Sequence, residues 1–300
     1  MKNTLFALMG VMLITGFASC TKDGVYTPKK KISTIYLESK TTSTVTATGI
    51  STSRSVPKYK SQEWIWDGNL LKEIRHFDTD GTTIRSTTTY TYNGKQLTRI
   101  DTKTTDIEYY MTFEYDGKWL KSSMYYANGK LLNATTYTHT DKKISSYETI
   151  RYGYYDYSSD KAAEIDAVYK EMMKPCGFVI PSSHAHNATK GTSESKETVE
   201  LTWTDNNITS VTTTTDGGKS SIALTYDEMK NPYYGLYNDE PYTPSMASEN
   251  NLLSTTSPEE PVSTYTYEKK YPVTQTMQYT TSLPAMTTVS EITYTYTYQK

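Results

Sequence analysis

The chain has 300 residues and a formal net charge of -2, from 31 basic and 33 acidic side chains. This near balance excludes a protein built to bind nucleic acid, which needs a basic face. The 29 tyrosines far outnumber the 5 phenylalanines and 4 tryptophans, and because Tyr joins an apolar ring to a hydroxyl that needs a partner, we expect many half-exposed rings.

The first twenty residues have the order of a secretory signal. A basic start at residues 1–3 precedes an apolar run at 5–14 and small residues that end at Cys20. The run is too short for a membrane-spanning helix, which needs about 20 apolar residues. The arrangement resembles a bacterial lipoprotein signal, although Phe17 stands where that pattern has Leu. The resemblance implies a signal peptide over 1–19 and an acylated Cys20 as membrane anchor; an ordinary secreted protein is the alternative.

The remaining chain is expected to form two parts. Residues 20–61 are interpreted as a lipidated N-terminus and polar tether, with room for a first strand, and residues 62–300 as a single β-meander domain. Cys176 then has no disulfide partner, because the chain has only two cysteines. A nucleophile there would need a nearby base and a lowered pKa, so we expect a packed, inert thiol.

Turn signals recur through the domain. Asp67, Asp80 and Asn93 follow one another at steps of 13 residues, and each precedes Gly. Asp-Gly and Asn-Gly supply the positive φ of tight hairpin turns. Between the turns apolar and polar residues alternate, most clearly over 107–115. The pattern predicts an antiparallel meander of hairpins with about ten residues per strand.

A common phrase marks the hairpins: an aromatic residue, any residue, a second aromatic, a turn, and then Leu or Ile. We expect these rings to stack as cross-strand neighbours, with Trp64, Trp66 and Trp203 on the inner face. The copies are Trp64-Ile65-Trp66 with Leu70, Tyr90-Thr91-Tyr92 with Leu97, Phe113-Glu114-Tyr115 with Leu120, Tyr137-Thr138-His139 with Ile144, and Leu201-Thr202-Trp203 with Ile208.

Three stretches interrupt the meander. Residues 159–174 carry an apolar stripe at helical spacing and predict one helix. Residues 181–196 are polar and loop-like, and 241–261, with four prolines, is interpreted as a long loop or surface excursion. Because a long sheet must cover its apolar face, we predict an all-β fold. It is a long antiparallel meander curled into a barrel or half-barrel, with the helix at 159–174 over an open side or end.

Phrases such as Tyr-Thr-Tyr-Asn-Gly-Lys-Gln-Leu at 90–97 resemble the YD-type repeats of large bacterial surface proteins. Together with the signal and with Lys-Asn-Pro-Tyr-Tyr-Gly at 230–235, they are similar to a family of uncharacterised Bacteroides lipoproteins, the domain of unknown function DUF4595. The resemblance covers residues from about 64 to the end. It implies a porin-like fold and an envelope location, and it brings no activity and no functional residues.

Catalytic signatures are lacking in the sequence. We find no Ser–His–Asp or Gly-x-Ser-x-Gly arrangement and no phosphate-binding Gly loop before a helix. His184 and His186 have no further ligand at metal-site spacing, so a solvated loop is expected there. We therefore predict no enzyme, no cofactor and no metal.

The remaining function class is a binding module. Trp119, Tyr110 and Tyr126 are candidates for stacking against a ligand, with core packing as the alternative. We expect an outer-membrane lipoprotein, held by acylated Cys20, that binds a glycan or a partner protein from a periplasmic or a surface position. The alternatives are a structural envelope scaffold and an integral outer-membrane β-barrel. Charged residues on the strands, such as Glu108, disfavour the integral barrel.

Overall fold

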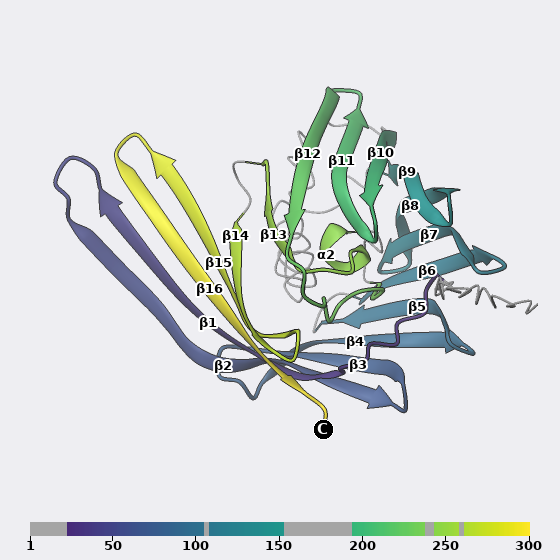
Figure 1. The fold of residues 1–300 in the computed structure, drawn as a ribbon, viewed down its shortest axis with the longest axis horizontal. Helices are drawn as coiled ribbons and strands as arrows, with labels where there is room; N and C mark the ends of the chain where they lie inside the picture. Colours follow the sequence, from purple (N-terminus) through teal and green to yellow (C-terminus); the bar gives the residue numbers. More distant parts are fainter. Residues whose placement is uncertain (1–22, 105–107, 153–193, 238–242, 258–260) are drawn as a thin grey trace, which may run out of the picture.

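The computed structural model describes residues 23–104, 108–152, 194–237, 243–257 and 261–300. Within them lie sixteen strands of one antiparallel sheet and one short helix (Figure 1). Cys20, Cys176, the histidine pair at 184 and 186 and the helix predicted at 159–174 lie outside the described residues. The elements are β1 (Ile32–Val45), β2 (Ser51–Asp67), β3 (Leu70–Phe77), β4 (Ile84–Asn93), β5 (Gln96–Lys103), β6 (Glu108–Asp116), β7 (Trp119–Ala127), β8 (Lys130–Thr140), β9 (Lys143–Tyr152), β10 (Glu194–Thr204), β11 (Asn207–Thr215), β12 (Gly218–Tyr226), α2 (Pro244–Ala247), β13 (Leu252–Thr255), β14 (Val262–Glu268), β15 (Tyr271–Leu283) and β16 (Met286–Tyr298).

The sheet curls into a nearly closed barrel, which confirms the predicted all-β architecture. Strands that follow one another in the sequence are neighbours in the sheet, except for β13 and β14, and β1 pairs with β16. The sheet ends at β13 and β14, which face each other across a seam. There the hydroxyl of Tyr265 donates a hydrogen bond of 2.9 Å to the carbonyl of Leu252. Side-chain contacts therefore bridge the gap that no strand ladder closes among the described residues.

The apolar faces of the strands meet inside the barrel. Trp64, the first aromatic of its phrase, is 3% exposed, and the first aromatics of the later phrases are also buried. The aliphatic residue that follows each turn is buried as well. One copy differs from the prediction, because Leu71 and not Leu70 is the fully buried residue after the first turn. The reason is the pairing at the turn: Asp67 pairs with Leu70 and Trp66 with Leu71, so Leu71 takes the place that Leu97 has opposite Tyr92.

A β-bulge at the same place recurs in every phrase. The register shifts between the middle residue and the second aromatic, because the partner strand after the turn has one extra residue there, such as Lys72 of β3. Such a bulge increases the local twist and bends the strand, so each hairpin contributes to the curvature of the sheet. The shifts lie at Ile65/Trp66, Thr91/Tyr92, Glu114/Tyr115, Thr138/His139 and Thr202/Trp203, and β12 has an equivalent one at Thr225/Tyr226.

The second aromatics connect consecutive hairpins through a contact that we call the rim hydrogen bond. The hydroxyl of Tyr115 donates to the main-chain carbonyl of Leu97, the buried residue after the preceding turn, at 2.7 Å. Because the ring is half buried while its hydroxyl has a fixed acceptor, Tyr suits this position better than Phe. The same bond joins Tyr92 to Leu71, Trp203 to Ile144 and Tyr226 to Ile208, and Trp66 makes an equivalent bond to Ile32.

The segment before β1 packs against the barrel. Residues 23–31 cross one end of it, which we call the N-terminal rim and which carries the tight turns at 67–70, 93–96, 116–119 and 140–143 (Figure 1). β1 and most of β2 follow within the range interpreted as a polar tether. The described residues of that range therefore form rim contacts and strands and not only a polar tether.

The expectation that 241–261 is a surface excursion is wrong for residues 243–257. All four residues of α2 are buried, with Met246 only 1% exposed. Pro244 suits the first turn of a helix, where its missing N–H costs nothing. Asn231, from the Lys-Asn-Pro phrase, donates to the carbonyls of Ser245 and Ser248 at 2.6 and 2.9 Å. Pro244 therefore begins a plug in the barrel interior, formed by residues 243–257 (Figure 1).

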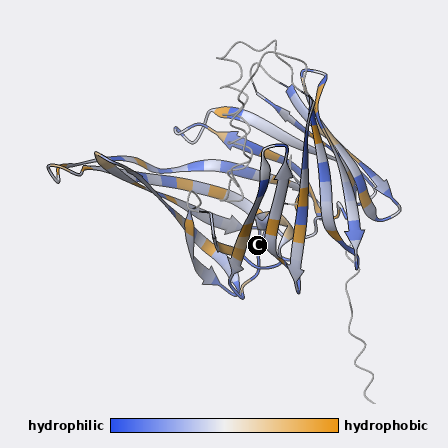
Figure 2. Cartoon of the chain, turned by 90° about the horizontal axis from the view of Figure 1, so that it is seen from above, coloured by the Kyte–Doolittle hydropathy of each residue, from blue (hydrophilic) through white to orange (hydrophobic). Residues whose placement is uncertain are grey.

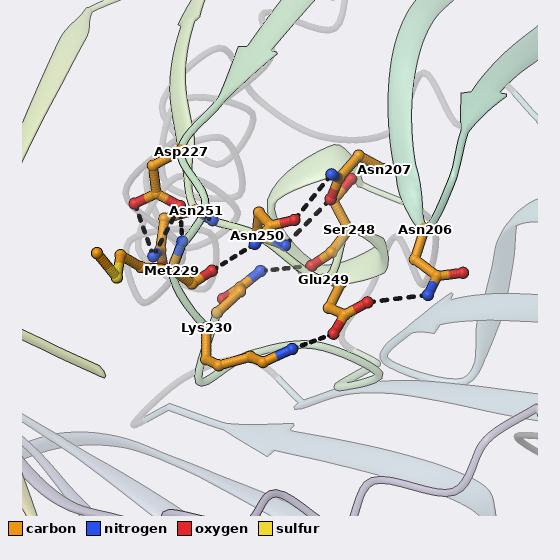
Figure 3. A network of polar contacts seen from close by, with 10 residues as sticks. Asn206, Asn207, Asp227, Met229, Lys230, Ser248, Glu249, Asn250 and Asn251 are labelled. Carbon is orange, nitrogen blue, oxygen red and sulfur yellow. Dashed lines mark hydrogen bonds and ion pairs between the residues drawn. The ribbon is translucent and has the colours of Figure 1, made fainter. Parts of the chain in front are cut away.

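A network of polar contacts holds this plug against the barrel, as Figure 3 shows. Asp227 Oδ1 accepts hydrogen bonds from the main-chain N–H groups of Met229 and Asn251, at 2.9 and 3.0 Å. The side chain of Asn250 accepts one from Asn207 at 2.9 Å, which ties the plug to the β10–β11 turn. The network thus has the geometry of a structural support.

Candidate functional site

Apolar side chains face inward and most charged ones face outward on this barrel, although the ion pair of Arg151 with Glu197 lies on the inward-facing side of β9 and β10. On the outer face Arg75 forms ion pairs with Glu63 and Glu73, at 3.5 and 2.6 Å, and Arg99 pairs with Asp101 at 2.5 Å. A barrel embedded in a bilayer needs an apolar band on its outer face. The charged outer face therefore argues against an integral outer-membrane barrel.

Two of the three stacking candidates meet on this outer face. Tyr110 of β6 and Tyr126 of β7 are cross-strand partners whose ring centroids lie 4.5 Å apart and nearly parallel. The guanidinium of Arg99 also lies over the ring of Tyr110, 3.9 Å from its centroid. Tyr110 is therefore already engaged by two neighbours, and Tyr126 is the more available ring for a ligand.

Trp119 lies at the other end of β7, on the N-terminal rim. Its ring centroid lies 5.5 Å from that of His139, and the ammonium of Lys118 is 4.9 Å from the indole ring. The three candidates therefore do not form one site. Sequence alternation placed each residue on a strand, but it carried no information about which rings share a row.

The cavity beside α2 is small. Its volume is about 10 Å³, which is room for about one water molecule. Asn231, Tyr265 and Tyr296 line it, and burial raises the pKa of both phenols above the ordinary value of 10.0. This cavity is too small for an organic ligand.

A second candidate surface projects beyond the barrel. We call it the wing, defined as the outer halves of β1 (38–45), β2 (51–58), β15 (279–283) and β16 (286–291). Figures 1 and 2 show it as an arm that extends away from the barrel body. Neither face is covered by another described element, and its tip residues Val45 and Ile50 are 41% and 63% exposed.

Hydroxyl groups line both faces of the wing in rows across its strands. Ser43 pairs with Thr288 across the β1–β16 ladder, and their hydroxyl oxygens lie 3.1 Å apart. On the opposite face the hydroxyls of Thr44 and Ser51 are 2.8 Å apart. The first row consists of Thr52, Ser43, Thr288 and Thr281, and the second of Ser51, Thr44, Thr287 and Ser282.

This surface was not predicted from the sequence. The stretches that build it are rich in Ser and Thr, and they have no apolar alternation because both faces meet solvent. A signal that could have found them is the pair of long Ser- and Thr-rich stretches at 39–55 and 279–293. Thr favours strands, so the two stretches predict a sheet that is polar on both faces.

The residues that the structure describes were searched for a metal site and for a membrane-spanning helix. They contain no group of three His, Cys, Asp or Glu side chains placed to hold a metal ion. No helix among them is long and apolar enough to cross a membrane.

Comparison with solved structures finds similarity to two porin-like proteins of Bacteroides. The protein from Bacteroides uniformis is 9% identical, with 87% of this chain and 97% of that chain covered and a TM-score of 0.35. The protein from Bacteroides vulgatus is 8% identical, with 90% and 99% covered and a TM-score of 0.28. No family model matches the sequence, and no curated protein matches it. Membership of DUF4595 therefore stays a prediction, and a likeness of this strength says nothing about activity.

Proposed function

We propose that this protein is a non-catalytic binding module of the cell envelope, anchored at the outer membrane through acylated Cys20. The signal-like first twenty residues support the anchor, and the expected membership of the Bacteroides lipoprotein family belongs to the same proposal. The wing is the surface that supports the binding function. The outward-facing charges of the barrel support a protein anchored by lipid in preference to one that spans the bilayer.

The wing supports binding because it contributes little to the core. Ordering each residue costs about 1–2 kcal/mol of backbone entropy, and Val45 and Ile50 at the wing tip bury little apolar surface in return. Rows of hydroxyls on adjacent strands repeat at about 4.8 Å. Such a surface can donate and accept hydrogen bonds with a polar ligand, either a glycan or a polar protein surface. Tyr126 is a secondary locus for stacking.

A structural scaffold is the second candidate. It is favoured because aromatic rings on the barrel contact other side chains of the same chain and are less available to a ligand. The ring of Tyr110, for example, contacts Arg99 and Tyr126. A scaffold needs the wing for its shape and not for its hydroxyls. The two candidates therefore differ in what removal of the hydroxyls does.

Fractionation and ligand screening test the proposal together. Cys20→Ala should release the protein from membranes, and recovery of that variant in the membrane pellet refutes the anchor. A glycan array and an envelope pull-down are then run with the intact protein and with a wing variant, Ser43→Ala, Thr52→Val, Thr281→Val and Thr288→Val.

The matched control removes four outer-face hydroxyls from the barrel, with Thr87→Val, Thr89→Val, Thr91→Val and Thr112→Val. We expect a ligand that the wing variant loses at least tenfold and the control retains. Equal binding by all three proteins contradicts the wing as the binding site. The absence of a ligand in both screens contradicts the binding function and favours the scaffold.

A further inference from the structure

The position of Asp23 on the barrel is fixed by several hydrogen bonds. Its main-chain N–H donates to the carbonyl of Lys118 at 3.0 Å. Its carboxylate oxygen Oδ2 accepts from the main-chain N–H of Leu120 at 2.8 Å and lies 3.0 Å from Nε2 of His139. The next carbonyl, of Gly24, accepts from the N–H of Leu97 at 2.8 Å. Asp23 is therefore part of the N-terminal rim.

The residues after Asp23 fit the barrel closely. Gly24 has φ +70°, and a Cβ atom there would lie 2.1 Å from the hydroxyl oxygen of Tyr115, so only glycine fits. The hydroxyl of Tyr26 donates to the carbonyl of Pro232 at 2.6 Å, and its ring lies 5.7 Å from that of Trp66. The segment is thus held at both ends of its path across the rim.

Only two residues, Thr21 and Lys22, lie between this fixed point and Cys20. The three Cα–Cα steps from Cys20 to Asp23 span at most about 11 Å when fully extended. An acylated cysteine has its main chain at the lipid surface, so Asp23 can lie no more than about 11 Å from that surface. The opposite rim is much farther away, because the nine-residue strand β6 alone is about 30 Å long.

We propose that the N-terminal rim of the barrel lies against the lipid surface, and that the wing points away from the membrane. This inference rests on the anchor in the proposed function. The turns that would meet the lipid headgroups are 67–70, 93–96, 116–119 and 140–143. Wing residues 38–45 lie at the other end of β1 from this rim and are the part of that strand farthest from the bilayer.

The short covalent connection is sufficient to impose the orientation, and the net charge of the rim acts in the same direction. The rim turns carry Lys95, Lys118, Lys142 and Lys143 against Asp67, Asp116 and Asp141, and the segment 23–31 adds Lys29, Lys30 and Lys31 against Asp23. This excess of positive charge attracts anionic lipids to the rim. Changing the connection between Cys20 and Asp23 separates the covalent effect from the electrostatic one.

The test uses the full-length acylated chain in vesicles of phosphatidylethanolamine and phosphatidylglycerol, with Cys176→Ser as background. A fluorophore is placed at Lys95→Cys on the N-terminal rim or, as the matched control, at Lys130→Cys on the opposite rim; both positions are exposed. Quenching by a nitroxide on the lipid headgroup reports closeness to the membrane. We expect at least fivefold stronger quenching at residue 95 than at residue 130.

Flotation of the same vesicles distinguishes failure of the proposed orientation from failure of the proposed membrane anchor. Protein that floats with the vesicles while both positions are quenched equally refutes the orientation and leaves the anchor intact. Protein that is not acylated and does not float refutes both. A flexible Gly-Ser linker of about twelve residues between Thr21 and Lys22 removes the constraint and should bring the two quenching values together. Persistence of the fivefold difference in the linker variant shows that something other than the short connection orients the barrel, and it also overturns the inference.

Discussion

Nε2 of His139 lies 3.0 Å from Oδ2 of Asp23, although 116 residues separate them in the sequence. His139 takes the place of the second aromatic in its phrase, where Tyr115 and Trp203 make rim hydrogen bonds. In this phrase the carboxylate of Asp23 is the partner of the side chain, and it also accepts from the N–H of Leu120. The histidine thus marks the hairpin at which the N-terminal segment docks.

Asp23→Ala should destabilise the fold by about 1–3 kcal/mol, because it leaves the Leu120 N–H and His139 without this acceptor. Urea unfolding of the chain without residues 1–20 measures the free energy of unfolding. Glu228→Ala, at an exposed position, is the control and should change that energy by less than about 0.5 kcal/mol. Equal effects of the two substitutions would show that the docking contact is not stabilising.

Tyr92→Phe and Tyr115→Phe should each lower the free energy of unfolding by about 1 kcal/mol, because each keeps the ring but leaves a carbonyl without its rim hydrogen bond. Tyr126→Phe is the matched control, since its hydroxyl contacts only the sulfur of Met124, at 3.4 Å. Urea unfolding of the three variants checks the prediction. If Tyr126→Phe costs as much as the other two, the rim hydrogen bonds have no special role.

Alkaline pH should unfold the protein through its buried phenols. Burial raises the pKa of Tyr92, Tyr115, Tyr226 and Tyr298 above the ordinary 10.0. A raised folded-state pKa means that the stabilisation is complete below pH 10 and is lost as pH rises beyond it, since the unfolded chain ionises first. We expect these phenols to titrate only when circular dichroism shows unfolding. Reversible ionisation of every tyrosine near pH 10 in a folded protein would contradict this.

Asn231→Ala should lower the free energy of unfolding by at least about 2 kcal/mol. The buried side chain donates to the carbonyls of Ser245 and Ser248 and accepts from the N–H of Tyr233, and alanine leaves all three without these bonds. Asn206→Ala is the control, because Asn206 is exposed and bonds only to Glu249 across the surface. A loss that is no larger for Asn231→Ala than for this control would contradict the role assigned to Asn231.

The sequence predicted the hairpins because their turns are chemically specific. Gly68, Gly94 and Gly117 all have positive φ, as the Asp-Gly and Asn-Gly pairs require. The sequence did not predict that Leu71 is the buried residue, because both positions after the first turn hold leucine and the local pattern does not say which of them pairs with Trp66. It also did not predict that Pro244 begins a buried helix. That depends on Asn231, which donates to two carbonyls beside the helix from a distant loop.

The candidate site was less predictable than the fold. Tyr110 and Tyr126 became neighbours through the β6–β7 register, which follows from the turn between them. The guanidinium over the ring of Tyr110 belongs to Arg99 on β5, and no local sequence pattern predicts this contact. Hydroxyl rows such as Ser43 with Thr288 need pairing between the two ends of the chain, which sequence periodicity does not encode.

The pairing of β1 with β16 has a consequence for how the chain folds. Thr34 and Thr297 lie side by side although 263 residues separate them, and contacts so distant in sequence form slowly. During synthesis the hairpins can form one by one, while the edge of β1 stays open until β16 has been made. A chain that lacks β16 would keep its hairpins and expose two bare edges, which invite aggregation. The thirteen-residue strand β16 therefore decides whether the edge of β1 is covered.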